Sequence, residues 1–201
     1  MTLIIGDATC RIDLSFSLTV TLMFLFCHSD TVILSLLSSL LHEAGHLIII
    51  YLTGQKILKV TFGAFGIRID RYITSSVSYK KEAFIALGGV LVNLILALSG
   101  FIHYCITDSD FSLRLTAVNV IIAIFNMIPI DTLDMGRVLR YTLLCSIDED
   151  ICDRILSVIS AVSVNLLAVI CFAVNIYIGF NLSLIIVTVY LYAITLFKKW
   201  S

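Results

Sequence analysis

Charged residues are scarce in this chain, and their scarcity indicates its class. Only 13% of its 201 residues are charged and 60% are hydrophobic, with a mean hydropathy of +1.07. These values lie far from those of an ordinary soluble domain. The sequence also lacks any evident linker, internal repeat or low-complexity run. We therefore predict one membrane-embedded domain over residues 1–201, with no soluble regulatory domain attached.

Paired cysteines are also lacking. The six cysteines form no CxxC pair, and we interpret them as free thiols that pack like small apolar residues.

The first apolar run has no basic stretch before it and no A-x-A-like site after it, which argues against a signal peptide. The net charge of −1 indicates no particular partner, and we expect no nucleic-acid partner.

Apolar runs provide the candidate membrane spans. They lie at residues 14–27, 31–53, 82–105, 111–144, 155–179 and 182–197. The first run is short enough to be either a tilted span or an interfacial helix, and we take it as a span. We predict an all-α polytopic membrane protein with about six transmembrane helices in the lipid bilayer.

Basic residues test this count independently. If the chain crosses the membrane at each run, all of its 13 lysines and arginines except Arg114 fall on one side. Basic residues are enriched in cytoplasmic loops. The asymmetry therefore predicts an integral, multi-pass protein with both termini in the cytosol.

The one extended polar insert lies between the second and third runs, at residues 55–81. Hydrophobic residues alternate there at Val60 and Phe62 and again at Ile67 and Ile69, around glycines. This pattern predicts a small β-hairpin at the cytosolic surface. The insert is either an amphipathic connector or an edge strand that pairs with the backbone of an unwound substrate.

The second run contains an HExxH motif, His42-Glu43-Ala44-Gly45-His46. Residues four apart share a helix face, so His42 and His46 can bind one zinc ion. Glu43 then lies where it can take a proton from the attacking water. The alternative is a pair of histidines that only pack between helices. Because ionisable groups at membrane depth are costly and usually functional, we favour the metal site.

Two histidines cannot hold a catalytic zinc ion alone, and the fourth run offers a third ligand. Pro129 should interrupt this helix near residues 126–134. Non-helical backbone at membrane depth is tolerated where it is buried in protein or lines a water-filled cavity. Asp131 and Asp134 follow the interruption, and either can be the ligand. The alternative is a helix that ends at the cytosolic surface with solvated aspartates.

Together these motifs resemble the site-2 protease family of intramembrane zinc metalloproteases. The resemblance rests on HEAGH, on Asn126 and Pro129 followed by Leu133-Asp134-Met135-Gly136-Arg137, and on Gly89-Val90-Leu91-Val92-Asn93. A six-span layout with an early HExxH is most similar to the stage IV sporulation protein FB type. That branch carries a carboxy-terminal nucleotide-sensing domain, and we expect no regulation by such a domain here.

The resemblance implies one zinc ion per chain, bound by His42, His46 and Asp134, with Glu43 as the general base. Asp131 either competes as a ligand or orients one. The Leu-Asp-x-Gly-Arg pattern favours Asp134. The chain departs from the family where Asp131-Thr132 replaces a proline-rich pair and where Met135 replaces a glycine.

The resemblance also implies roles for residues around the metal. Asn126 holds the substrate or stabilises the developing oxyanion. Gly89 and Asn93 line the site or allow helices to approach closely. Pro129 shapes the non-helical segment.

The implied activity is intramembrane proteolysis in a bacterial cell membrane. The expected substrates are membrane-tethered proteins such as transcription factor precursors or anti-sigma factors. They would be cut within or near the cytosolic end of a transmembrane segment. The alternatives are a proteolytically inactive membrane adaptor and a zinc transporter.

Overall fold

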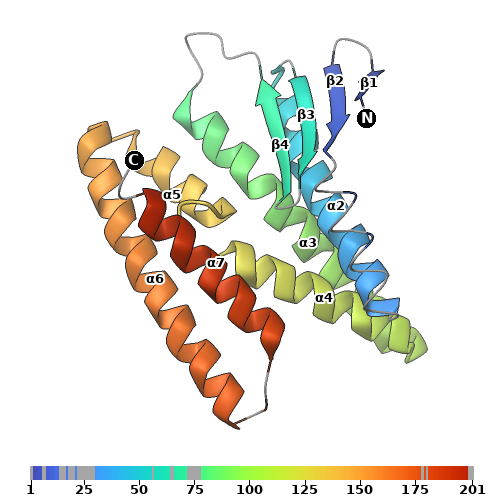
Figure 1. Ribbon diagram of the computed structural model, residues 1–201. Helices are drawn as coiled ribbons and strands as arrows, with labels where there is room; N and C mark the ends of the chain where they lie inside the picture. The colour runs from blue at the N-terminus through green and yellow to red at the C-terminus, as the bar shows by residue number, and fades with distance from the viewer. Residues whose placement is uncertain are drawn as a thin grey trace. The chain divides into compact units, whose positions relative to one another are not determined.

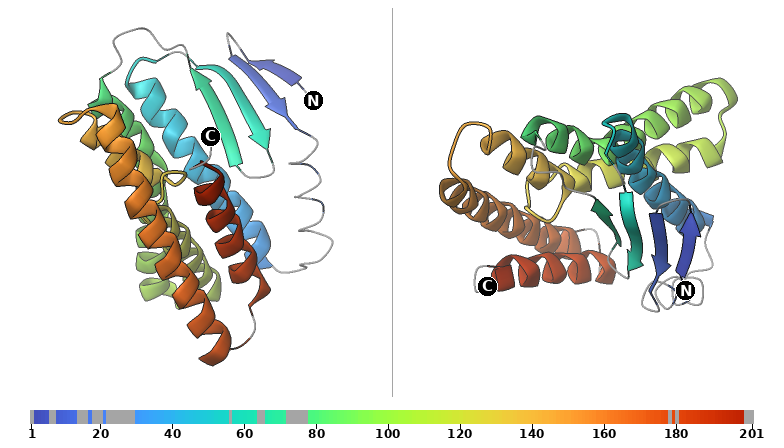
Figure 2. Two further views of the ribbon diagram at one scale, coloured as in Figure 1. Left: turned by 60° about the vertical axis from the view of Figure 1, so that its left-hand side comes forward. Right: turned by 90° about the horizontal axis from the view of Figure 1, so that it is seen from above.

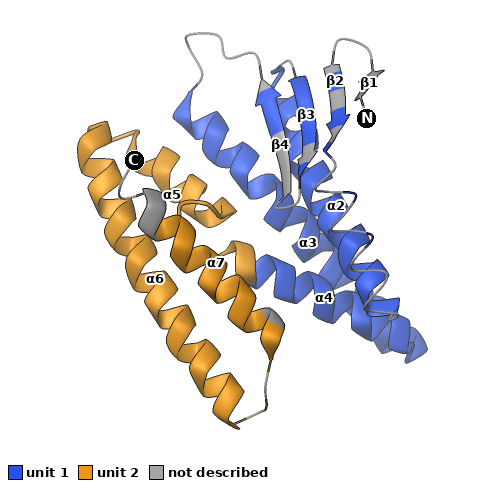
Figure 3. Cartoon of the chain, in the orientation of Figure 1, with its two compact units in different colours: residues 1–124 blue, residues 125–201 orange. Residues whose placement is uncertain are grey.

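The computed structural model describes residues 2–5, 8–13, 17, 21, 30–55, 57–63, 66–71, 78–177, 179 and 181–198. The chain divides into two compact units, Met1–Ile124 and Phe125–Ser201 (Figure 3). The first predicted span, residues 14–27, lies outside the described residues apart from Ser17 and Thr21.

The first unit contains a four-stranded sheet in the order β1-β2-β3-β4 (Figures 1 and 2). Its strands are β1 (Thr2–Ile5), β2 (Ala8–Ile12), β3 (Ile57–Gly63) and β4 (Gly66–Arg71). Strands β3 and β4 form an antiparallel hairpin that pairs Val60 with Ile69 and Phe62 with Ile67. The predicted hairpin between the second and third spans is therefore confirmed.

Two strands add to the predicted fold. Strands β1 and β2 pair antiparallel, and β2 pairs parallel with β3, with Thr9 opposite Lys59. Only Gly6 and Asp7 separate β1 from β2, a dipeptide that favours a tight hairpin. The hairpin after the second span is thus part of a larger sheet that begins at the N-terminal end.

Two long apolar helices, α2 (Asp30–Leu52) and α3 (Tyr79–Thr107), pack side by side in this unit (Figure 1). Their backbones touch at two glycines. A Cβ atom added to Gly45 would collide with the carbonyl oxygen of Gly88, and one added to Gly88 would lie 2.7 Å from the carbonyl oxygen of Gly45. Small residues permit this close approach.

Helix α4 (Asp110–Asn126) folds back along α3. The turn is made by Asp108, whose left-handed backbone (φ 52°) closes the end of α3. The Asp108 N–H donates to the carbonyl oxygen of Tyr104 (2.8 Å). Across the turn, His103 Nδ1 of α3 lies 2.6 Å from Ser112 Oγ of α4. The two helices therefore form an antiparallel pair, so residues early in α4 face residues late in α3.

The second unit contains α5 (Asp134–Leu143), α6 (Glu149–Tyr177) and α7 (Leu182–Lys198). Helix α4 ends at Asn126, and the following segment 127–133 is not an α-helix. The sequence predicts an interruption here, at Pro129. Ile130 in this segment is buried together with Val164 of α6 and Leu191 of α7. The non-helical segment is thus part of the unit's hydrophobic core.

Polar contacts also hold segment 127–133. The backbone N–H of Asp131 donates to Ser160 Oγ (3.0 Å). The Asp131 carboxylate lies 3.6 Å from Arg140 Nη1. A Cβ atom on Gly136 would collide with the carbonyl oxygen of Ile130. The segment therefore packs directly on the first turn of α5.

Three helices in the described part of the chain are long and apolar enough to cross a membrane, namely α2, α3 and α6. Helix α7 has a shorter apolar stretch, Leu184–Thr195, and α4 has 17 residues. The protein is mostly helical, as predicted, while the count of six spans stays a prediction.

Candidate metal centre

His42 lies on α2 and is buried, with 5% of its surface exposed. Its Nδ1 atom lies 2.5 Å from the side-chain oxygen of Asn93 on α3. An amide oxygen only accepts hydrogen bonds, so Nδ1 carries the ring proton. The Nε2 atom therefore presents a lone pair that can bind a metal ion.

His46 follows one turn later and is equally buried, at 6% exposure. Its Nδ1 atom lies 2.8 Å from the backbone carbonyl oxygen of Ile85. A carbonyl oxygen accepts only, so His46 also carries a proton on Nδ1, and Nε2 is its nitrogen that can bind a metal ion. The two imidazole rings lie edge to face, with centroids 5.0 Å apart.

Gly89 provides the space that both rings occupy. A Cβ atom at this position would lie 2.5 Å from His42 Nε2 and 2.6 Å from His46 Nε2. Both distances are far below a normal van der Waals contact. The absence of a side chain at Gly89 therefore allows the two nitrogens to lie over the same stretch of α3.

Asp134 is the first residue of α5 and is buried, at 6% exposure. The extended backbone of Leu133 precedes it (φ −96°, ψ 165°). The positive end of the helix dipole stabilises a carboxylate at this position. Met135 adopts ordinary helical backbone in the same turn, so its replacement of a glycine introduces no strained conformation beside Asp134.

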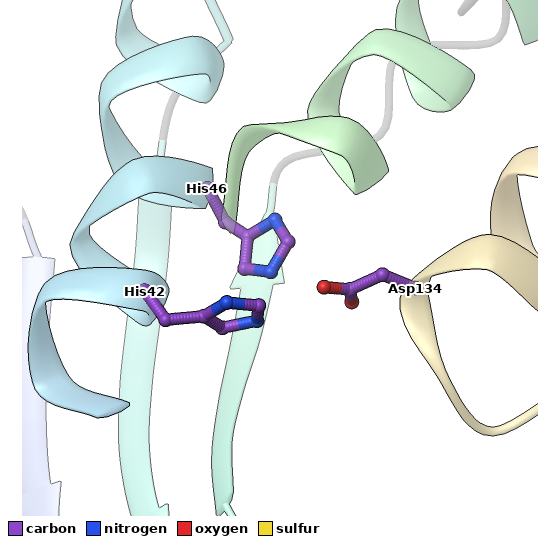
Figure 4. A group of neighbouring side chains, drawn as sticks. All are labelled: His42, His46 and Asp134. Atoms are coloured by element: carbon purple, nitrogen blue, oxygen red, sulfur yellow. The ribbon is translucent and has the colours of Figure 1, made fainter. Parts of the chain in front are cut away.

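The potential ligand atoms of His42, His46 and Asp134 lie within 4.8 Å of one another (Figure 4). Two imidazole nitrogens and one carboxylate oxygen match the donor set of catalytic zinc sites, which leave one coordination position open. The group could therefore bind a metal ion.

The other predicted site residues have the following places. Glu43 is half-buried on α2 beside His42, and Asn126 is the half-buried last residue of α4. Pro129 is half-buried in the non-helical segment. Asp131 is paired with Arg140 and is not among the three grouped ligands.

Asn119 and Ser38 are buried residues that were not predicted as part of the site. Both belong to a hydrogen-bond network that reaches His42 through Asn93. Asn93 Nδ2 donates to Asn119 Oδ1 on α4 (2.9 Å), and Asn119 Nδ2 donates to Ser38 Oγ on α2 (3.1 Å). Ser38 precedes His42 by one helical turn, a spacing visible in the sequence. The contact of Asn119 depends on the register between α3 and α4, which the sequence does not reveal.

The search of protein-family models finds no match to this chain, and the search of curated proteins finds none either. Among solved structures, the site-2 protease from Methanocaldococcus jannaschii is similar, with a TM-score of 0.66. The sequences are 22% identical, and the alignment covers 96% of this chain and 91% of that one. The chain therefore shares the fold of a site-2 protease along nearly its whole length.

Proposed function

We propose that this chain is an intramembrane zinc metalloendopeptidase of the site-2 protease family. The observation that carries the proposal is the HExxH motif whose two histidines each present Nε2, grouped with the carboxylate of Asp134. The shared fold supports it. Within the family, the early HExxH and the predicted six-span layout favour the stage IV sporulation protein FB type.

His42, His46 and Asp134 would hold one zinc ion. Bound there, zinc supplies Lewis acidity that polarises the peptide carbonyl and lowers the pKa of water. The Glu43 carboxylate takes a proton from the attacking water and later delivers it to the leaving amine. Asn126 donates a hydrogen bond to the oxygen on which negative charge develops.

The substrates we propose are membrane-tethered proteins such as transcription factor precursors or anti-sigma factors, in a bacterial cell membrane. His46 lies six residues before the end of α2 at Leu52, or about 9 Å along a helix. If that end faces the cytosol, the cleaved bond lies near the cytosolic end of the substrate's membrane segment. Strand β4 at the edge of the sheet offers backbone groups to an extended substrate.

The general base is tested by Glu43→Gln. The amide cannot accept the proton from water at neutral pH, so cleavage of a tagged membrane substrate should be lost while metal content is kept. Comparative proteomics of membranes from cells with the wild type and the variant should show uncleaved precursors that accumulate only with the variant. Substantial cleavage by Glu43→Gln would refute the mechanism.

The metal site is tested by measuring bound zinc in purified protein. The wild type should contain one zinc ion per chain, and His46→Ala and Asp134→Ala should each contain far less. A matched control is His103→Ala, which removes a histidine of α3 that contacts Ser112 instead of the ligand group. Equal zinc content in all four proteins would contradict the proposal.

The two alternative functions make different demands on the structure. A zinc transporter needs polar ligands that continue the path beyond the site. The polar side chains that extend from His42 are amides and a hydroxyl engaged with one another. An inactive adaptor needs no metal, so stoichiometric zinc in the wild type together with loss of cleavage in Glu43→Gln would distinguish the protease from it.

A further inference from the structure

A chain of buried polar side chains connects the three helices of the first unit. It runs from His42 on α2 to Asn93 on α3, then to Asn119 on α4 and back to Ser38 on α2. Asn93 and Asn119 have no exposed surface, and Ser38 has 1%. Buried amides are costly unless their hydrogen bonds are satisfied, so this arrangement is strongly constrained.

The direction of each hydrogen bond in the chain follows from one backbone group. Asn119 Nδ2 donates to the carbonyl oxygen of Leu115 (2.9 Å), which can only accept. The Asn119 side chain therefore cannot be flipped without losing this bond, and its oxygen must face Asn93. Asn93 must then donate from Nδ2 and turn its own oxygen toward His42.

The last step of this sequence concerns the imidazole. Because the Asn93 oxygen faces His42 Nδ1, a proton is held on Nδ1, and in the neutral ring Nε2 is then the nitrogen that can bind a metal ion. A flipped Asn93 would present an N–H group instead, which favours the tautomer with the proton on Nε2. That tautomer cannot bind a metal ion through Nε2.

We propose that Asn119 is a positioning residue that sets the tautomer of His42 through Asn93. The metal role of this effect rests on the proposed function, whereas the tautomer itself does not. His46 obtains the same result directly from the Ile85 carbonyl. A backbone carbonyl group thus sets the tautomer of each histidine. The Ile85 carbonyl acts on His46 directly, and the Leu115 carbonyl acts on His42 through the amides of Asn119 and Asn93.

Ser38 has a different part in the network. Its oxygen accepts the second hydrogen bond from Asn119 Nδ2, but a hydroxyl can either donate or accept and so does not define direction. The Leu115 carbonyl keeps Asn119 oriented without it. Ser38→Ala should therefore affect the site much less than Asn119→Leu, although both remove a buried polar group.

The test compares Asn119→Leu with the wild type in the full chain, purified in detergent. In metal-free protein with ¹⁵N-labelled histidine, the wild type should show His42 with its proton on Nδ1. The variant should show a mixture of tautomers. Affinity for Co²⁺, measured against a competing chelator, should fall about 10- to 100-fold, as observed when groups that orient metal ligands are lost.

One control and one substitute variant separate the positioning role of Asn119 from its packing. Ser112→Ala removes another buried polar contact between α3 and α4, the one to His103, and should leave Co²⁺ affinity and the His42 tautomer unchanged. Should Asn119→Leu fail to fold, Asn119→Thr replaces it. A threonine hydroxyl can donate to the carbonyl four residues back, as Thr116 does to Ser112, but it is too short to reproduce the bond to Asn93.

The outcomes are distinguishable from failure of the proposed function. A wild type that binds no Co²⁺ would overturn the metal site, and the tautomer measured in metal-free protein would still decide the role of Asn119. An unchanged His42 tautomer in the folded Asn119 variant would overturn the inference, whatever the metal affinity. A shifted tautomer together with the expected loss of Co²⁺ affinity would establish it.

Discussion

Gly89 shows how a single missing side chain can decide whether two ligands meet. Both Nε2 atoms lie too close for a Cβ atom to be added at this position, and neither ring can move away freely. His42 is held by Asn93 and His46 by the Ile85 carbonyl. A methyl group at residue 89 would therefore have to displace a hydrogen-bonded, buried imidazole.

We predict that Gly89→Ala lowers metal affinity by more than about 100-fold, beyond the usual cost of losing a group that orients a ligand. Titration with Co²⁺ measures this loss. The matched control is Gly100→Ala on the same helix, about 16 Å away along its axis. There the nearest atom to an added Cβ is the side-chain oxygen of Thr116, at 2.8 Å. Equal affinities of the two variants would show that Gly89 does not shape the site.

Individual residues differ in how far the sequence predicts them. His42 and His46 follow from a motif whose spacing directly places both on one helix face. Asp134 follows from a resemblance, because both aspartates after Pro129 have suitable chemistry. Asn119 could not be predicted, since an asparagine in an apolar helix has many possible partners, and its contact depends on how α4 folds back at Asp108.

At the scale of elements, the non-helical segment before α5 is fixed by its neighbours. Ile130 enters the hydrophobic core, and Asp131 contacts Ser160 and Arg140. Arg140 also binds the Asp153 carboxylate (2.6 Å). One arginine of α5 therefore links the segment that precedes Asp134 to α6.

We predict that Arg140→Ala lowers the free energy of unfolding by about 1 kcal/mol, because partly exposed ion pairs contribute little. Metal affinity should fall several-fold, since the segment before Asp134 loses a restraint. Thermal unfolding and Co²⁺ titration measure the two effects. The control is Arg137→Ala, which removes an exposed arginine from the same helix. A larger loss of metal affinity in the control would contradict this role of Arg140.

Elements were predicted well where the pattern is local. The alternation around Val60 and Ile69 indicates the β3–β4 hairpin, because both strands lie within one short insert. Strand β2 was missed, since its partner β3 is distant in sequence and no local pattern reports a parallel pairing. Helix α3 begins at Tyr79, before the predicted 82–105, because Lys80 and Lys81 are helical although they are too polar for an apolar run.

At the scale of the whole molecule, the sheet bears on membrane orientation. Strand β2 precedes α2 and strand β3 follows it, yet the two are neighbours in one sheet. Because strands of one sheet lie on one side of a membrane, the N-terminal strands and the connection between α2 and α3 should face the same compartment. This arrangement agrees with the placement of basic residues.

We predict that cysteines introduced at Arg11 and Asp70 react from the same side of the membrane. Both positions are exposed and lie in the sheet. A cysteine at Asp110, beyond the far end of α3, should react from the opposite side. The measurement is labelling with a membrane-impermeant maleimide in intact and lysed cells, in a background without native cysteines. Labelling of Arg11 and Asp70 positions from opposite sides would refute the orientation.

The parallel pairing of β2 with β3 also has a consequence for the order of assembly. During synthesis, β2 leaves the ribosome before α2, and β3 leaves after it. Strand β2 must therefore wait for α2 to be made before this pairing can form, and closing such a long loop makes the contact slow relative to local helix formation. The sheet is thus completed only after the helix that carries both histidines.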